Sequence, residues 1–250
     1  MILLHKPLGE TPLETLDRLR LEKLELADLP MTYAGRLDPM AEGLLIVLVG
    51  EETKEKDKYT NLDKEYEFEV LFGFQTDTAD LLGKVVQRDV PLPVECKDVP
   101  LPYIQDYLKK LVGKHSQVYP NYSSKTVNGK PLWLWAREGK TDEIEIPTKE
   151  IEVYSLDLIN MREISGAELL KNIEEKISKI KGDFRQQEIL DLWRKNLFSC
   201  LTTYYLLLTT RVRCSSGTYI RSIVERLGEL VGVPTVAYSI KRTRIGEYQI

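Results

Sequence analysis

The chain has 250 residues and a net charge of −4, from 35 Lys and Arg against 39 Asp and Glu. This length allows one large domain or two small ones with a sizeable core. A composition of 42% hydrophobic and 30% charged residues is ordinary for a soluble globular protein. The acidic balance argues against indiscriminate nucleic-acid binding but allows a local basic groove.

The sequence offers no sign of a membrane, secretory or metal-binding protein. No apolar run is long enough to span a membrane, and the N terminus does not read as a secretion signal. The three cysteines, Cys96, Cys200 and Cys214, lack metal-ligand spacing. The two histidines, His5 and His115, lie far apart. We therefore expect a cytoplasmic protein without a metal site.

A strand, a turn and a helix are expected at the N terminus. Residues 2–4 are apolar, and Pro7 and Gly9 then favour a turn. Thr11 is followed three positions later by Glu14, which is the spacing of a capping box at the start of a helix.

The stretch from residue 35 to residue 49 holds a carboxylate on a stiff loop. Residues 44–49 are apolar and predict a buried strand. Just before them, Pro39 biases Asp38 away from helical angles, and Gly35 and Gly43 permit unusual backbone angles. A carboxylate fixed in this way can be a nucleophile or a general base. Asp-Pro pairs are also common in ordinary turns, so these residues alone leave both interpretations open.

The middle of the chain predicts strands joined by polar turns. Residues 64–73 alternate, so that Tyr66 shares one face with other apolar side chains. Residues 73–80 read as a polar turn before a strand over residues 83–90. The proline-rich residues 91–102 predict a surface connection.

A mixture of aromatic and basic residues follows. Residues 103–112 predict a helix that ends at Gly113. Residues 117–139, which include Lys125, could stack on single-stranded RNA and neutralise it, or form a packed helix with a basic rim. Residues 144–159 read as strand-rich.

Residues 165–198 are highly charged and predict two helices with a turn at Gly182-Asp183. Residues 202–213 then predict a central strand. It leads through Gly217-Thr218 into a helix whose first turn carries Arg221. The late cluster of basic residues, from Arg211 to Arg244, fits either a local groove or a solvated helix face with a charged edge strand.

Several of these stretches resemble one enzyme family. Residues 35–45, Gly-Arg-Leu-Asp-Pro-Met-Ala-Glu-Gly-Leu-Leu, resemble the catalytic motif of pseudouridine synthases, in the variant of the TruB family. Other family motifs occur in the family's order. One precedes this stretch, at residues 6–11, and the others follow it, at residues 50–54, 64–66, 73–80, 120–139, 212–222 and 240–248.

The resemblance implies an α/β fold in which helices flank a mixed, largely antiparallel sheet with an RNA cleft across its middle. Residues 1–250 would form one catalytic domain, with residues 165–198 as a helical-hairpin insertion, because most members are shorter there. The C-terminal RNA-binding PUA domain that many members carry is not expected in this chain.

The implied activity is isomerisation of the T-loop uridine of tRNA, at position 55, to pseudouridine. The expected partner is the T arm of tRNA, and the protein is expected to act as a monomer. Because no atom enters or leaves in this reaction, no cofactor is required.

The resemblance also implies roles for individual residues. Arg221 would pair with Asp38, the nucleophile or base, and stabilise its ionised form. Tyr66 would pack against the target base, and its hydroxyl is a candidate proton acceptor. Tyr219 would line the uracil pocket, and Ile240 would form its apolar wall.

Further residues are implied in substrate binding, and some depart from the family pattern. Arg242 matches a family arginine, and Lys125 matches a family lysine. Tyr33 stands where members commonly have a histidine that helps to flip the nucleotide, and a tyrosine can stack there but cannot become cationic. Arg36 is closer to synthases of ribosomal RNA. A synthase for another RNA and an RNA-binding module without catalysis are therefore the rival hypotheses.

Overall fold

The structure, a computed structural model, describes residues 1–88 and 101–249. The first ten residues of the proline-rich connection, 91–100, therefore lie outside the described residues. The strands are β1 (Ile2–Lys6), β2 (Met31–Ala34), β3 (Ala41–Val49), β4 (Lys64–Phe72), β5 (Phe74–Thr76), β6 (Val85–Arg88), β7 (Gly113–Val118), β8 (Thr126–Val127), β9 (Lys130–Pro131), β10 (Thr148–Ser165), β11 (Tyr204–Cys214), β12 (Thr235–Ile245) and β13 (Tyr248–Gln249). The α-helices are α1 (Pro12–Glu22), α2 (Lys56–Thr60), α3 (Leu101–Lys110), α4 (Leu132–Arg137), α5 (Gly166–Ser178), α6 (Gln186–Leu197) and α7 (Ile220–Val231).

One large sheet organises the described chain, with the strand order β1-β3-β12-β4-β11-β10-β7. Strand β2 pairs with β3, and β13 pairs with β12. Every pairing in this sheet is antiparallel except that of β12 with β3. The expected mixed, largely antiparallel sheet with flanking helices is therefore confirmed.

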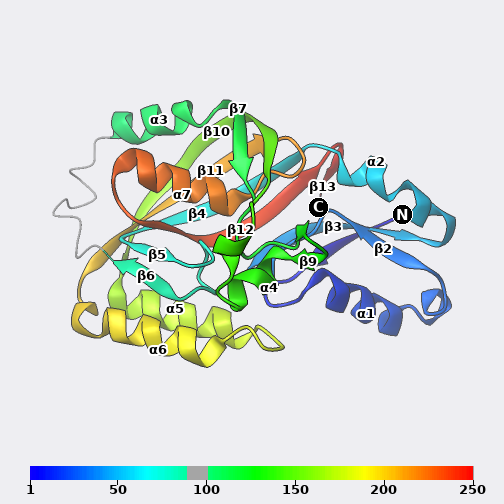
Figure 1. The fold of residues 1–250 in the computed structure, drawn as a ribbon, viewed down its shortest axis with the longest axis horizontal. Helices are drawn as coiled ribbons and strands as arrows, with labels where there is room; N and C mark the ends of the chain where they lie inside the picture. The colour runs from blue at the N-terminus through cyan, green and yellow to red at the C-terminus, as the bar shows by residue number, and fades with distance from the viewer. Residues whose placement is uncertain (89–100, 250) are drawn as a thin grey trace.

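Helices cover both faces of the sheet (Figure 1). In β4, Phe68 and Val70 point to one face, where they join a buried cluster with side chains of α3 and α7. Leu71 points to the opposite face, into a second cluster with Ile173 of α5 and Trp193 of α6. The alternation along the strand thus buries apolar side chains against helices on both sides.

The pairing of β12 with β3 brings the two ends of the chain together. Gly43 of β3 lies opposite Arg242 of β12, with φ at +112°. A Cβ atom on Gly43 would lie 2.3 Å from the carbonyl oxygen of Arg242, so that only glycine allows this approach. Because of this contact, the loop before β3 lies beside the middle of the sheet.

The predicted helical hairpin agrees with the structure, whereas two predictions for residues 73–90 differ from it. Residues 165–198 form the two predicted helices with their turn at Gly182-Asp183, and we call residues 165–198 the helical hairpin. Residues 73–80 are not a turn throughout, because Phe74–Thr76 pairs with β6 as a short strand. The expected strand over residues 83–90 is shorter within the described chain, at Val85–Arg88.

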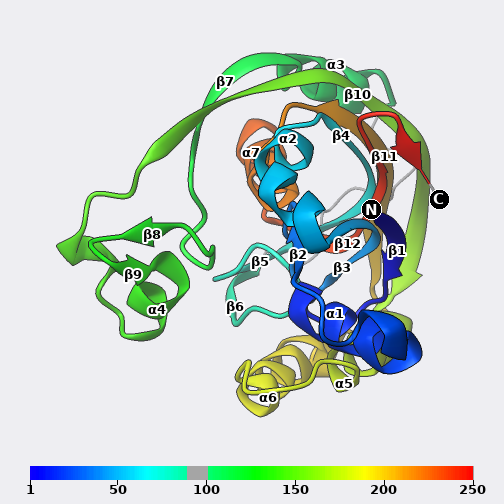
Figure 2. The same cartoon turned by 90° about the vertical axis from the view of Figure 1, so that its right-hand side faces the viewer.

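The segment that contains β8, β9 and α4 projects from the body of the molecule (Figure 2). Strands β7 and β10 lead into and out of it. Among the residues that the structure describes, no helix is long and apolar enough to cross a membrane.

Candidate active site

Asp38 lies on a short loop between β2 and β3 that is fastened at several points. The amide of Ala41 donates to the carbonyl of Asp38 at 3.0 Å, and the amide of Gly9 donates to the carbonyl of Pro39 at 3.0 Å. The fully buried Lys6 donates from Nζ to the carbonyl of Ala41 at 2.5 Å. Burial lowers the pKa of Lys6 to about 8, against the opposing charge of Asp38. Lys6 is therefore a structural support directly beneath the site.

Arg221, in the first turn of α7, meets Asp38. Its Nε atom lies 2.9 Å from Oδ2 of Asp38. Its other two nitrogens donate to backbone carbonyls, Nη1 to Thr78 at 2.7 Å and Nη2 to Tyr122 at 3.2 Å. Burial would lower the pKa of Arg221, but Asp38 and then Asp80 reverse the effect and raise it. The guanidinium is thus a fixed cation, with only 2% of its residue surface exposed.

Asp80 is a second carboxylate beside Arg221, and the sequence analysis did not single it out. Its Oδ2 lies 3.9 Å from Nε of Arg221. Its Oδ1 accepts from the hydroxyl of Thr78 at 2.7 Å and from the amide of Leu82 at 3.0 Å. Burial raises the pKa of Asp80 to about 6, although Arg221 opposes this shift. Its only sequence signal was its place in the motif of residues 73–80.

Two cavities meet at the pair of Asp38 and Arg221. The smaller, of about 260 Å³, is also lined by Tyr66, Tyr219, Ile240 and Arg242. The larger, of about 330 Å³, extends toward Trp133 and Arg137 of α4. Both cavities share a wall formed by Arg36, Leu37, Asp38, Ser124 and Arg221.

Comparisons with known proteins agree with this geometry. A family model described as "TruB family pseudouridylate synthase (N terminal domain)" matches residues 26–184. The chain belongs to the TruB family. A tRNA pseudouridine synthase B of Bacillus cytotoxicus is 32% identical over all of this chain and 67% of the relative. One from Caldanaerobacter subterraneus is 33% identical over 87% of this chain and 60% of the relative. The chain thus spans about two thirds or less of the length of these two relatives.

A solved structure shares the fold of this TruB family chain. The crystal structure of a Cbf5-Nop10-Gar1 complex aligns with 99% of this chain and 49% of the matching chain, with a TM-score of 0.58. The sequence identity is 19%, so this likeness concerns the fold.

The smaller cavity contains the residues that the TruB motifs predict for a base pocket. Tyr66 of β4 and Ile240 of β12 come from neighbouring strands, and both are nearly buried. Burial raises the pKa of Tyr66, whereas the neighbouring Arg242 opposes this shift. Tyr219, at the start of α7, packs its ring edge-on against Tyr119, with 5.9 Å between ring centres. These aromatic and apolar walls suit a flat nucleobase.

Arg242 is buried beneath the loop that carries Asp38. Its Nε donates to the carbonyl of Leu44 at 2.8 Å, and its Nη2 donates to the carbonyl of Gly35 at 3.1 Å. A third, longer contact joins Nη1 to the carbonyl of Arg36 at 3.4 Å. The side chain therefore supports the loop that carries Asp38, in addition to lining the smaller cavity.

Lys125 and Tyr33, the last two predicted site residues, lie outside the two cavities. Lys125 is exposed and lines neither cavity, but its Nζ lies 5.1 Å from the centre of the ring of Tyr119, which lines the smaller one. Tyr33 packs beside a separate apolar cluster that includes Leu16 and Val47, and it lines neither cavity. The structure therefore does not bring Tyr33 into the site. Within residues 1–88 and 101–249, no group of His, Cys, Asp or Glu side chains could hold a metal ion.

We expect Asp80→Asn to stabilise the fold above pH 6. The pKa of Asp80 is about 6 in the fold against an ordinary 3.8, so its charge destabilises the folded state increasingly from pH 4 to pH 6 and fully above it. Asparagine removes that charge, and the free energy of unfolding at pH 8 should rise by about 1–3 kcal/mol.

Urea unfolding of both proteins at pH 4.5 and pH 8 would measure this effect, and the difference should shrink at the lower pH. If Asp80→Asn were less stable than wild type at pH 8, the ionised carboxylate of Asp80 would not destabilise the fold as we infer.

Proposed function

We propose that this chain isomerises the T-loop uridine of tRNA, at position 55, to pseudouridine. The observation that carries the proposal is the ion pair of Asp38 and Arg221 at the junction of two cavities. Membership of the TruB family and the printed names of the relatives, tRNA pseudouridine synthase B, support it.

The reaction breaks the bond from N1 of uracil to C1′ of the ribose, turns the base and joins C5 to the same carbon. The electron pair of the broken bond goes to the base and is then used to join C5 to C1′. The proton on C5 is lost after this bond forms, and N1 gains a proton, so that the product is an isomer. Because the target base lies inside a folded loop, it has to be flipped into a pocket. The smaller cavity would hold it between Tyr66 and Ile240, with Tyr219 alongside.

Asp38 would act at the sugar, either as a nucleophile at C1′ or as a base toward the hydrogen on C2′. Both roles start from the ionised carboxylate, which the guanidinium of Arg221 stabilises at 2.9 Å. The low exposure of Arg221 strengthens this contact, since little water competes for it.

Tyr66 is the candidate acceptor for the proton that leaves C5. Its phenol is buried, which raises its pKa and opposes this role. Arg242 lies beside it and lowers the same pKa, so the fold contains a charge that favours the ionised hydroxyl. Packing against the base requires only the neutral ring.

The larger cavity would hold the nucleotides that flank the target. Arg36 is exposed at the wall that both cavities share, and Arg137 and Trp133 lie on α4 at the far side. Arginines can contact phosphates while an aromatic ring stacks on a base. We assign the T arm of tRNA to this side. We also expect residues 1–250 to form one catalytic domain and the protein to act as a monomer in the cytoplasm.

The decisive experiment maps pseudouridine after incubation of the protein with unmodified RNA transcripts. Chemical modification followed by primer extension should show one product, at position 55 of tRNA, and none in a transcript with cytidine there. Product confined to ribosomal RNA would replace the proposed substrate. RNA binding without any product would show a binding module and refute the enzyme.

A further inference from the structure

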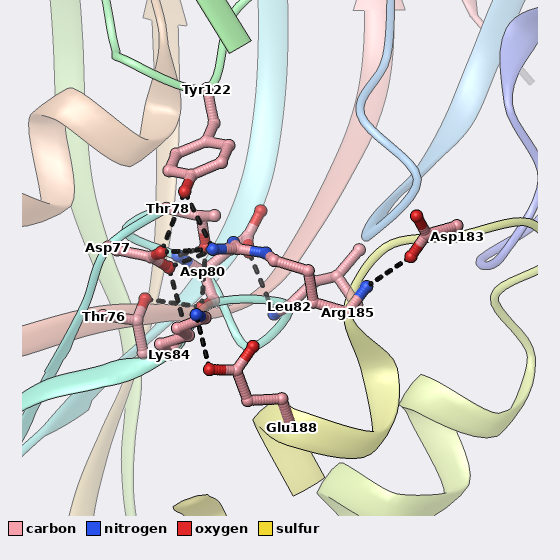
Figure 3. Close-up of polar contacts among 10 residues, drawn as sticks. All are labelled: Thr76, Asp77, Thr78, Asp80, Leu82, Lys84, Tyr122, Asp183, Arg185 and Glu188. Atoms are coloured by element: carbon pink, nitrogen blue, oxygen red, sulfur yellow. Dashed lines mark hydrogen bonds and ion pairs between the residues drawn. The ribbon is translucent and has the colours of Figure 1, made fainter. Parts of the chain in front are cut away.

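The tip of the helical hairpin meets Asp77, which lies between β5 and β6, and Tyr122, which precedes β8 (Figure 3). Arg185 extends from the tip, and its Nη1 lies 2.7 Å from Oδ2 of Asp77. The same Nη1 donates to the hydroxyl of Tyr122 at 2.8 Å, and the guanidinium lies over the ring of Tyr122 at 4.7 Å. Tyr122 in turn donates from its hydroxyl to Asp77 at 3.1 Å. The three side chains thus close a triangle.

Both partners of Arg185 lie next to the groups that hold Arg221. The backbone carbonyl of Tyr122 accepts from Nη2 of Arg221. Asp77 directly precedes Thr78, whose carbonyl accepts from Nη1 of Arg221. One arginine of the hairpin therefore fixes the two chain segments, before β6 and before β8, that orient the catalytic guanidinium.

The hairpin is itself fastened to the loop that carries Asp80. The indole of Trp193 donates to the carbonyl of Leu81 at 3.2 Å, and Glu188 pairs with Lys84 at 2.5 Å. These contacts come from α6, which begins immediately after Arg185. The tip cannot move without disturbing the loop beside Arg221.

The backbone at the tip is held in an unusual conformation. The φ angle of Arg185 is +63°, in a region of backbone conformation that residues other than glycine rarely adopt. The carboxylate of Asp183 accepts from the amide of Arg185 at 3.3 Å, and the same side chain pairs with Arg137 of α4 at 2.7 Å. Such a conformation persists when surrounding contacts determine it, and here those contacts aim Arg185 at Asp77.

We propose that Arg185 is a positioning residue of the active site, which holds Asp77 and Tyr122 so that Arg221 meets Asp38. This inference rests on the proposed function. It assigns the helical hairpin a role in turnover, because the hairpin supplies a support for the catalytic pair that the strands of the sheet do not provide.

The test compares Arg185→Ala and Arg185→Lys with Arg194→Ala in the full chain. Arg194 is the matched control, because it lies on α6 of the same hairpin in an exposed ion pair with Glu174. Arg185→Ala should lower kcat, measured at saturating tRNA, by roughly 10- to 100-fold, since small misplacements of catalytic groups are costly. Arg185→Lys should have a kcat between those of Arg185→Ala and wild type, because lysine keeps the charge but lacks the planar guanidinium. Arg194→Ala should match wild type.

Two further measurements separate positioning from stability. Thermal unfolding should show each variant folded at the assay temperature. The ¹⁵N resonance of Arg221 Nε in the free protein should shift in Arg185→Ala and stay unchanged in Arg194→Ala. A kcat within twofold of wild type for folded Arg185→Ala, or an unshifted resonance, would overturn the inference. An inactive wild type would refute the proposed function, and the resonance would still decide on Arg185.

Discussion

Asp38→Asn is expected to abolish pseudouridine formation, by at least roughly 10⁴-fold, while tRNA binding persists. An amide of the same size can neither attack C1′ nor accept a proton from C2′. The variant should still fold, because Arg221 keeps Asp80 as a counter-charge and keeps its two backbone carbonyls. The side chain of Asp38 is 30% exposed, so the substitution leaves no deeply buried group unpaired.

Single-turnover assays with enzyme in excess of tRNA measure the chemical step, and filter binding measures affinity. Glu42→Gln is a matched control, since it removes one negative charge only four positions away on β3. It should react at close to the wild-type rate. Undiminished turnover by Asp38→Asn would exclude the carboxylate from the mechanism, and loss of binding together with turnover would indicate a structural role instead.

Local patterns predicted the elements that carry the site, because their physical causes are local. The alternation in residues 64–73 places Tyr66 on the same face of β4 as Phe68 and Val70, and this follows from the period of a strand alone. The Asp38 loop is set by Pro39 and by a buried apolar strand that follows. These features depend on backbone angles and on the period of a strand, and both are encoded in a few consecutive residues.

The roles of Asp80 and Arg242 depend on contacts between distant segments, and local patterns do not contain them. Asp80 lies in a stretch that was predicted to be a polar turn, and its buried carboxylate faces Arg221 of α7, which is distant in the sequence. Arg242 was predicted to bind substrate from its motif alone. The parallel pairing of β12 with β3 also directs its guanidinium to the carbonyls of Gly35 and Leu44, which the motif does not indicate.

The positions of Tyr33 and Arg185 are two further features that local sequence patterns do not predict. The family motif predicts an RNA-contacting side chain at Tyr33, but it does not indicate that this partly buried ring packs beside the cluster of α1 and β3. The pattern of the helical hairpin predicts two amphipathic helices but not where their turn points. That direction follows from burial of Trp193 against Phe74, with ring centres 5.1 Å apart.

Arg221→Lys should show whether the site needs a cation or a guanidinium. Lysine can place one charge near Asp38, but it cannot also reach the carbonyls of Thr78 and Tyr122 with separate nitrogens. Leaving buried carbonyls unpaired and burying an ammonium group should cost about 2–4 kcal/mol of unfolding free energy. Turnover should fall by roughly 10²- to 10³-fold, because the counter-charge to Asp38 loses its fixed position.

The matched control is Arg226→Lys, an exposed position on the same helix, which should behave as wild type in turnover and in urea unfolding. Arg221→Met is a second comparison, in which the side chain carries no charge. If Arg221→Lys were as fast as wild type while Arg221→Met was inactive, charge alone would suffice. The fork of hydrogen bonds, and with it the supporting role of Tyr122 and Thr78, would then be dispensable for the reaction. A slow but folded Arg221→Lys protein would instead show that the direction of the guanidinium limits the rate.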